Sequence, residues 1–332
     1  MLGKGASRRK DGPPQWLGVR LGRLHLDSPI VTAAGTFGIA DECLTSVDTR
    51  WIGAFTTKSL SVTGWRGNPP PRLTRAPAGM LNSVGLDNPG VERWIEEALP
   101  RIERHRVPIV ASIWGRSIEE FSAAAELLGS CGSVVAIEVN LSCPNLEAPE
   151  DVVAHSAAAS KRVVKEVVGI ANQSDKAVFA KLSPNLPTIV PVAEAVLEAG
   201  AEVLTISNTV LGMAIDHERL SPVLGNVTGG LSGPAIKPVV MRHIWEVWEA
   251  IGPVPIVGTG GVFNACDAIE FMAAGASAIG VGSVSFYEPR APERIGRELA
   301  ALCKSHKIGD LQSIVGSAHL AAKSAGGRGR AF

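Results

Sequence analysis

The sequence predicts an α/β fold, a (β/α)8 TIM barrel with long loops or hairpins on its top face. Short, apolar, β-branched runs alternate with longer helical patterns along the whole chain, which is typical of βαβ units around a parallel sheet. There are eight such runs, the number that a closed barrel needs. The length of 332 residues suits one barrel with insertions, since such barrels typically take about 250 residues.

The predicted strands are nearly continuously apolar, as buried parallel strands are. They are Pro29–Gly35, Gly53–Leu60, Pro108–Gly115, Ala136–Cys143, Ala177–Pro184, Val203–Thr209, Pro255–Gly261 and Ala278–Phe286. The predicted helices are Val91–His105, Ser117–Ser130, Glu150–Val168, Leu186–Ala199, Pro234–Ile251, Ala265–Ala274 and Pro292–His306. Ser117 is a start signal for its helix, and Gly200 and Gly275 lie where glycine stops are expected.

A doubly wound open sheet is the alternative fold, but no G-x-G-x-x-G motif follows the first strand. The stretches Ser61–Pro89 and Leu211–Gly233 are too long for ordinary connections, so we expect functional loops or hairpins on the barrel top. We interpret residues 1–14 as a disordered basic tail, 15–310 as one barrel domain, and 311–332 as a C-terminal helix and tail.

Composition narrows the class of protein. The formal net charge is zero, so no nucleic-acid partner is expected. No run approaches the roughly 18–20 apolar residues of a membrane span. Five cysteines without a signal peptide favour a reducing cytoplasm. None of them forms a C-x-x-C pair, so we expect neither a metal site nor an iron–sulfur cluster within this chain.

The seventh predicted strand ends in the glycine-rich segment Gly258–Gly261, and the eighth contains Gly280–Ser283. Glycines there let backbone N–H groups approach a phosphate, in front of a helix N-terminus. The alternative interpretation is that they form tight turns and nothing more. Because both turns are glycine-rich, we favour a phosphate site.

Two lysines, Lys58 and Lys181, lie in apolar strand runs. A buried lysine is costly unless it is paired or functional. Either could stabilise negative charge on a cofactor ring that is being reduced, although a structural ion pair is the simpler alternative. Lys181 could also form a Schiff base, as in barrel aldolases.

Amide side chains and one thiol collect near the same strand ends, where a barrel builds its active site. Asn82, Asn140, Asn145 and Asn208 supply donors and acceptors that suit a heterocycle with alternating N–H and C=O groups. Cys143 lies among them and could be a nucleophile or a general base, or a small buried filler.

Several motifs together resemble class 1 dihydroorotate dehydrogenases. They are Asn140-Leu-Ser-Cys-Pro-Asn145, Lys181-Leu-Ser-Pro-Asn185, Asn82-Ser-Val-Gly-Leu86, Ser207-Asn-Thr209, Gly229-Gly-Leu-Ser-Gly-Pro-Ala-Ile-Lys237 and Gly260-Gly261. They occur in the same order and with closely similar spacing between about Leu17 and Ile308. The stretch Asn226–Pro238 is most similar to class 1B, the NAD-linked subclass.

The resemblance implies FMN-dependent oxidation of dihydroorotate to orotate in pyrimidine biosynthesis. Cys143 would remove the C5 proton while a hydride passes from C6 to flavin N5, with Lys58 beside it and Lys181 at the polar edge of the flavin. The implied substrate-binding residues are Lys58, Asn82, Ser83, Val84, Gly85, Leu86, Asn140, Asn145, Asn208 and Thr209. The implied cofactor-binding residues are Ala34, Gly35, Lys58, Ser59, Ser112, Asn140, Lys181, Ser207, Gly233, Gly260, Gly261, Gly282 and Ser283.

The resemblance also implies partners. In class 1B the electrons leave through a separate iron–sulfur subunit that carries FAD and reduces NAD, which agrees with the lack of cluster cysteines here. Efficient reduction of fumarate would instead indicate class 1A behaviour. We also expect a homodimer.

This sequence departs from the subclass at three places. Ala34 replaces a frequent serine, Ser112 replaces a usual asparagine, and the stretch Leu146–Val152 is shorter than the usual loop over the substrate. These changes leave open a related FMN barrel reductase that acts on another dihydropyrimidine or an enone. A non-redox phosphate-binding barrel using Lys181 is the alternative from another class.

Overall fold

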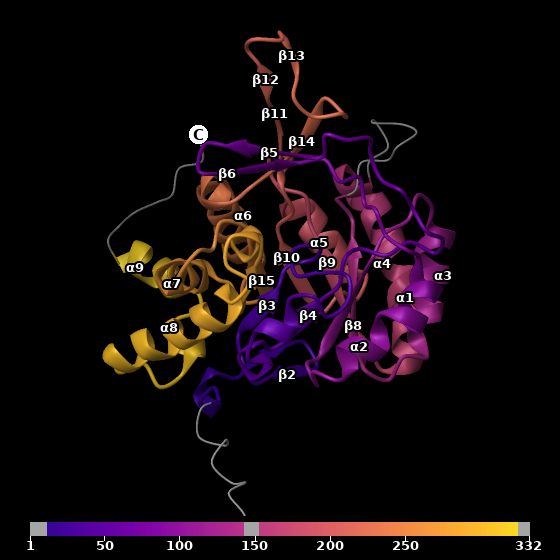
Figure 1. The fold of residues 1–332 in the computed structure, drawn as a ribbon. Helices are drawn as coiled ribbons and strands as arrows, with labels where there is room; N and C mark the ends of the chain where they lie inside the picture. The colour runs from indigo at the N-terminus through magenta and orange to yellow at the C-terminus, as the bar shows by residue number, and fades with distance from the viewer. Residues whose placement is uncertain (1–11, 143–152, 325–332) are drawn as a thin grey trace, which may run out of the picture.

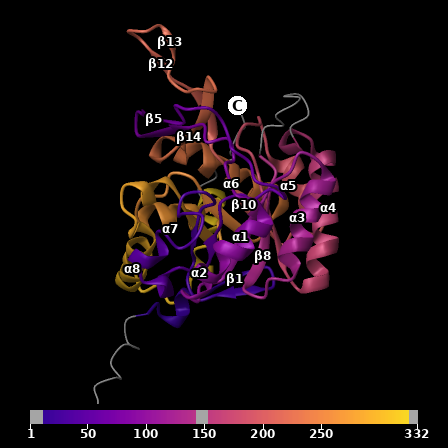
Figure 2. The ribbon, with the colours of Figure 1, turned by 45° about the vertical axis from the view of Figure 1, so that its right-hand side comes forward.

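Eight parallel strands form a barrel in the computed structural model, which describes residues 12–142 and 153–324 (Figures 1 and 2). The strands are β3 (Ile30–Thr32), β4 (Phe55–Thr56), β7 (Ile109–Ile113), β8 (Val134–Asn140), β9 (Ala177–Lys181), β10 (Val203–Ile206), β15 (Ile256–Thr259) and β16 (Ala278–Val281). Their order is β3-β16-β15-β10-β9-β8-β7-β4, and a parallel bridge from Val31 to Ala54 joins the two ends. The predicted barrel is confirmed, with strands shorter than their apolar runs.

Helices surround the barrel as predicted, with adjusted ends. They are α1 (Val91–Glu97), α2 (Leu99–Glu103), α3 (Ile118–Gly129), α4 (Ala157–Ala171), α5 (Val190–Glu198), α6 (Lys237–Ile251), α7 (Ala265–Ala274), α8 (Ala291–Ser305) and α9 (Ser317–Ser324). The Ser117 side chain accepts the Glu120 N–H at the start of α3, and Gly275 ends α7 at φ +130°. Helix α4 begins after Ser156, and the residues before Val153 in its predicted range lie outside the described residues.

The predicted helix Val91–His105 is two helices. Pro100 lies in the first turn of α2, where its missing N–H is tolerated but where it cannot continue the preceding helix. Short 3₁₀ turns connect other elements. They include η1 (Gln15–Leu17), η2 (Leu44–Ser46), η3 (Thr49–Trp51), η5 (Val153–His155), η6 (Asn172–Ser174), η7 (Pro234–Ile236), η8 (Ser283–Phe286) and η9 (Leu311–Ser313).

A short antiparallel hairpin of β1 (Val19–Leu21) and β2 (Leu24–Leu26) covers the bottom of the barrel (Figure 1). Leu21 and Leu26 are buried, and they pack with the lowest inward-facing side chains of the barrel strands. Sequence analysis did not predict this hairpin. Its apolar side chains close the bottom of the barrel, and the polar residues lie at the opposite end.

The two long stretches between barrel elements form one antiparallel sheet above the barrel (Figures 1 and 2). Its strands are β5 (Leu73–Ala76), β6 (Gly79–Asn82), β11 (Val210–Met213) and β14 (Thr228–Ser232), in the order β11-β14-β6-β5. A two-stranded ribbon of β12 (Ile215–Asp216) and β13 (Ser221–Pro222) projects beyond it. The expected hairpins are present, and the pairing of β14 with β6 joins the two stretches.

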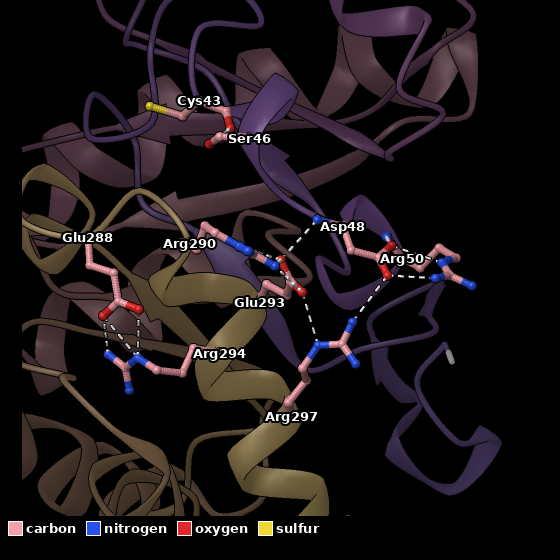
Figure 3. A network of polar contacts seen from close by, with 9 residues as sticks. All are labelled: Cys43, Ser46, Asp48, Arg50, Glu288, Arg290, Glu293, Arg294 and Arg297. Carbon is pink, nitrogen blue, oxygen red and sulfur yellow. Dashed lines mark hydrogen bonds and ion pairs between the residues drawn. The ribbon is translucent and has the colours of Figure 1, made fainter. Parts of the chain in front are cut away.

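Helix α8 is joined to the first βα unit by an ionic network, called here the closing seam (Figure 3). The buried carboxylate of Glu293 accepts the Asp48 N–H at 3.1 Å and hydrogen bonds from Arg290 at 3.1 Å and Arg297 at 3.0 Å. Burial opposes ionisation of Glu293, but these hydrogen bonds outweigh it and hold its pKa below the ordinary value. Asp48 also accepts from Arg50. The network fixes the last helix beside the first strands.

Candidate functional site

Inward-facing side chains change from apolar to polar toward the top of the barrel. Residues two apart on a strand point to the same side. The lower layer is Val31, Ala54, Val110, Ala136, Phe179, Val203, Val257 and Ala278, all in one buried apolar cluster. Two residues further along each strand lie Ala33, Thr56, Ser112, Glu138, Lys181, Thr205, Thr259 and Gly280. Most of this second layer lines a small cavity at the barrel mouth.

A buried pair of opposite charges lies in this polar layer. Glu138 is 3% exposed and Lys181 is 5% exposed. The Lys181 Nζ lies 3.8 Å from Glu138 Oε1, which is an ion pair without a direct hydrogen bond. The two carboxylate oxygens accept hydrogen bonds from Ser112 and Thr205, each at 3.0 Å. Lys181 therefore lies in the polar layer of the barrel with a carboxylate beside it.

A line of hydrogen bonds connects this carboxylate to Asn140. The Asn140 Nδ2 donates to Ser59 Oγ at 3.0 Å, and Ser59 Oγ lies 3.0 Å from Ser112 Oγ. Ser112 in turn donates to Glu138. Strands β7 and β8 place Ser112 opposite Glu138 in register. The structure thus brings three predicted site residues into one network.

Asn140 and Asn208 also meet. The Asn208 Nδ2 donates to Ser142 Oγ at 2.9 Å and lies 3.4 Å from Asn140 Oδ1, while its Oδ1 accepts the Thr209 N–H at 2.8 Å. Ser207 is 2% exposed, and its N–H donates to Thr259 O across the strand ends. The carboxyl ends of β8 and β10 therefore present two mutually oriented amides.

The predicted substrate loop Asn82–Leu86 lies at the edge of the top sheet. Asn82 Nδ2 donates to Gly230 O at 3.1 Å, and Ser83 Oγ accepts from Asn68 at 2.9 Å. Val84 O accepts the Asn68 N–H, and Gly85 and Leu86 both adopt positive φ, at +69° and +63°. Gly230 comes so close to Thr209 that a Cβ there would lie 2.0 Å from its Oγ1. Strand β14 thus links this loop to the end of β10.

Lys58 follows β4 and is partly buried beside the first βα turn. A Cβ at Gly35 would lie 3.1 Å from Lys58 Cδ and 3.3 Å from its Nζ, so a glycine is needed where the two segments touch. Ala34 lines the same cavity as Lys181. These residues form the side of the mouth opposite β9.

Three glycine-containing segments lie together above β15 and β16. Gly260 and Gly261 have positive φ, and a Cβ at Gly261 would lie 2.9 Å from the backbone N of Lys237, at the start of α6. Gly233 precedes η7, which leads into α6. Within residues 12–142 and 153–324, the N–H groups of Gly261, Gly282 and Ser283 have no hydrogen-bond acceptor. Such free donors beside two strand ends suit an anion.

Two predicted site residues, Cys143 and Asn145, lie outside the described residues, as does the stretch Leu146–Val152. Sequence analysis missed Glu138, Thr205 and Thr259, whose Oγ1 is buried without a partner. The missed signal for Glu138 was available: an acid inside the apolar run of β8 is as costly as the lysine inside β9. The threonines gave no signal, because threonine is common in strands.

No group of three metal-ligating side chains occurs among the residues that the structure describes. None of the described helices is both long enough and apolar enough to cross a membrane.

The dihydroorotate dehydrogenase family model matches residues 16–303. The chain is 42% identical over 304 residues to the "Dihydroorotate dehydrogenase B (NAD(+)), catalytic subunit" of Citrifermentans bemidjiense, covering 92% of this chain and 98% of that protein. It is 42% identical to the protein of the same name from Trichlorobacter lovleyi, covering 91% and 98%. In fold it is similar to the crystal structure of a DHODH from Eimeria tenella in complex with ferulenol, with a TM-score of 0.77 at 20% identity, covering 95% and 91%.

Proposed function

Because this chain belongs to the dihydroorotate dehydrogenase family, whose enzymes are FMN-dependent oxidoreductases of pyrimidine biosynthesis, we propose that the barrel mouth is its active site. The activity is the oxidation of dihydroorotate to orotate. The observation that carries the site assignment is the polar layer around Lys181, directly below glycine turns with free N–H groups.

The residues at the mouth fit FMN. The free N–H groups of Gly261, Gly282 and Ser283 supply donors for a single phosphate. A Cβ at Gly282 would meet only Ala33 at 3.5 Å and Thr36 at 3.9 Å, so the protein leaves room there that a bound group can use. Lys181 supplies a positive charge at the cavity, which suits the electron-rich edge of the flavin ring.

When bound, FMN accepts the hydride that leaves C6 of dihydroorotate. The chain's own residues must orient the pyrimidine and remove the C5 proton, whose C–H electron pair becomes the new C5–C6 double bond. Asn82, Asn140 and Asn208 offer amide donors and acceptors at adjoining strand and loop ends, and Asn145 is assigned with them from the family motif. We assign the proton to the Cys143 thiolate, with Lys58 nearby.

The alternative of an aldolase-type lysine is not favoured, because the family is a redox family and Lys181 is paired with Glu138. Another dihydropyrimidine or an enone stays a second candidate substrate, favoured by one observation. Ser112, which replaces the asparagine usual in the subclass, is bonded to Ser59 and Glu138 within the barrel.

The partners are also proposed. The relatives' name, "catalytic subunit", supports a second subunit that passes electrons to NAD, and we propose an iron–sulfur flavoprotein with FAD for that role. We propose a homodimer, the domain limits 15–310, and a cytoplasmic location. Described cysteines Cys43, Cys131, Cys266 and Cys303 are all free thiols, which suits a reducing compartment.

One purification tests the proposal. The protein should carry a flavin that is released on denaturation and co-chromatographs with FMN, and anaerobic dihydroorotate should bleach its visible absorbance. Recovery of FAD, or no binding of added FMN, would refute the cofactor site. Bleaching by another dihydropyrimidine at a higher rate than by dihydroorotate would favour the second candidate. Reduction of NAD by the chain alone at a rate matching that with the partner would contradict the two-subunit proposal.

A glycine variant tests where the phosphate binds. Gly282→Ala should weaken FMN binding at least tenfold, because its Cβ would occupy the room left beside the free N–H groups. Gly282 has φ −114° and ψ −114°, a backbone conformation that alanine disfavours, so unfolding of the FMN-free variant is measured beside its FMN affinity. Gly132→Ala is the matched control, since nothing lies within 4 Å of a Cβ there. Equal FMN affinity for both variants would place the phosphate elsewhere.

A further inference from the structure

The buried carboxylate of Glu138 has no role in the proposed reaction, although it lines the same cavity as Lys181 and Ala34. Burying a carboxylate is costly, and an apolar or amide side chain of similar size would avoid the cost. Two other strands nevertheless supply partners for both of its oxygens, Ser112 from the adjacent β7 and Thr205 from β10 beyond β9. The site therefore supplies a hydrogen-bond donor to each oxygen of this buried carboxylate.

Glu138 forms its hydrogen bonds with one set of groups and its ion pair with another. Two hydroxyl groups donate to Glu138 at 3.0 Å, whereas the Lys181 ammonium stays 3.8 Å away. That distance is too long for a hydrogen bond, so the Lys181 N–H groups are not used by the carboxylate. Glu138 therefore offsets the charge of Lys181 and leaves the Lys181 N–H groups available to a ligand at the barrel mouth.

Charge at this position matters because a flavin gains electrons in the reaction. A lone lysine below the ring favours the reduced flavin, and a carboxylate close to that lysine opposes it. The barrel interior screens such effects weakly. The charges of Lys181 and Glu138, which lie at the bottom of the proposed active site, therefore act on the flavin in opposite directions.

We propose that Glu138 is a positioning residue that cancels the charge of Lys181 at the floor of the active site and so keeps the reduction potential of the bound flavin low. This inference rests on the proposed function, since it requires FMN at the barrel mouth. A low potential would suit a catalytic subunit that must pass electrons onward to a nicotinamide acceptor rather than hold them.

The test is the midpoint potential of bound FMN in Glu138→Gln, which keeps the shape of the side chain and removes its charge. A unit charge about 10 Å away, at an effective dielectric constant of about 20, changes an equilibrium by roughly tenfold. We expect the variant to favour reduced over oxidised flavin about tenfold more than wild type, which is a shift of about +30 mV for a two-electron couple. Glu138→Asp, which keeps the charge, should stay within about threefold of wild type.

A second buried glutamate provides the matched control. Glu293→Gln removes the same charge in the closing seam, so it should lower stability and leave the flavin potential unchanged. A wild-type potential in Glu138→Gln would overturn the inference. If that variant does not fold, the double variant Glu138→Gln/Lys181→Met removes both charges together. The midpoint potential of its bound FMN should match that of wild type. Lys181→Met alone should lower the potential, which favours oxidised flavin. Equal potentials for the double and single variants would also overturn it.

The outcomes separate this inference from the proposed function. Wild-type protein that binds FMN and is reduced by dihydroorotate upholds the function, whatever the Glu138 variants show. Wild-type protein that binds no FMN refutes the function and this inference together. Titrating oxidised FMN into the FMN-free Glu138→Gln protein measures its FMN affinity. A variant whose site is folded should still bind FMN.

Discussion

Glu138 at the barrel mouth and Glu293 in the closing seam are both 3% exposed, yet their partners differ. Glu293 accepts hydrogen bonds from two guanidinium groups and a backbone N–H (Figure 3). Glu138 accepts from two neutral hydroxyls, and its cation stays 3.8 Å away. In the seam the cationic groups donate hydrogen bonds to the carboxylate. At the mouth the N–H groups of Lys181 are not bonded to the carboxylate, so a ligand can still accept from them.

The difference separates a structural ion pair from one that we propose to be functional. The guanidinium groups in the seam are bonded directly to the acid, and their other faces reach solvent. Such an arrangement stabilises the fold and offers nothing to a ligand. In the mouth the lysine is buried with donors left over, which is tolerated only where something else binds. Mouth variants should therefore alter chemistry or flavin binding, and seam variants should alter stability.

The largest effect is expected at Cys143. Cys143→Ser should slow flavin reduction by dihydroorotate about 10²–10⁴-fold, the usual contribution of a general base. Serine is a far weaker acid, so the rate should recover only at more alkaline pH. Anaerobic stopped-flow measurement across pH gives the answer, with FMN content as the control. A rate near wild type at neutral pH would show that the base lies elsewhere at the mouth.

Lys181→Ala should have the next largest effect. Removing a charged hydrogen-bond donor is expected to weaken FMN binding by about 10- to 100-fold, from the roughly 1.5–3 kcal/mol of such a bond. Fluorescence titration of FMN into the flavin-free protein measures it. The matched control is Lys161→Ala, because Lys161 is paired with Glu198 on the protein surface. Unchanged FMN affinity and reducibility in Lys181→Ala would remove the distinction between mouth and seam.

Glu293→Gln should act on stability alone. It loses charge-assisted hydrogen bonds, but Arg290 and Arg297 are 65% and 42% exposed and can rehydrate, so we expect a cost of about 1–2 kcal/mol at neutral pH. The lowered pKa of Glu293 means that its contribution is present above the unfolded value of about 4.3 and is lost as pH falls through the folded value.

Denaturant unfolding at neutral and acid pH tests this prediction. Wild type and Glu293→Gln should differ at pH 7 and converge as the pH falls below about 4. Activity of the folded variant at pH 7 should equal that of wild type. A stability gap that stays constant down to low pH would mean that the carboxylate charge is not the source of the effect.

The smallest effect is expected at a second ion pair near the start of α8, separate from the contacts of the closing seam (Figure 3). Glu288 pairs with Arg294 at 2.9 Å, but its side chain is 42% exposed. Glu288→Gln should therefore change the free energy of unfolding by less than about 1 kcal/mol, as for other surface pairs. The measurement is the same unfolding series, run beside Glu293→Gln. A cost equal to that of Glu293→Gln would show that burial is not what separates the two glutamates.

The barrel could be predicted from sequence because each buried parallel strand is a self-contained apolar run. The hairpin β1–β2 could not, because its strands have three residues each, too few for the alternation of apolar and polar residues to be recognised. The top sheet was missed as a sheet for another reason. Asn82 and Gly230 are 148 residues apart, and no local pattern announces a pairing at that distance.

The candidate site also has features that could be predicted from the sequence and features that could not. Lys181, Asn140 and Asn208 were expected together because the carboxyl ends of parallel strands meet at one face, and the structure places them there. The partnership of Lys181 with Glu138 depends on the register between β8 and β9, which sequence alone does not supply. The roles of Cys143 and Asn145 stay predictions, since both lie outside the described residues.

The pairing of β16 with β3 has a consequence for how this chain is made. Ile30 pairs with Ile279, and the Asp48 N–H bonds to Glu293 across 245 residues of sequence. On the ribosome, β3 is among the first segments to emerge, but its partner on this side emerges near the end of synthesis. Until then it presents an open strand edge, which is a template for aggregation. A chain cut before Ala278 should therefore need chaperones to stay in solution, however complete its catalytic residues are.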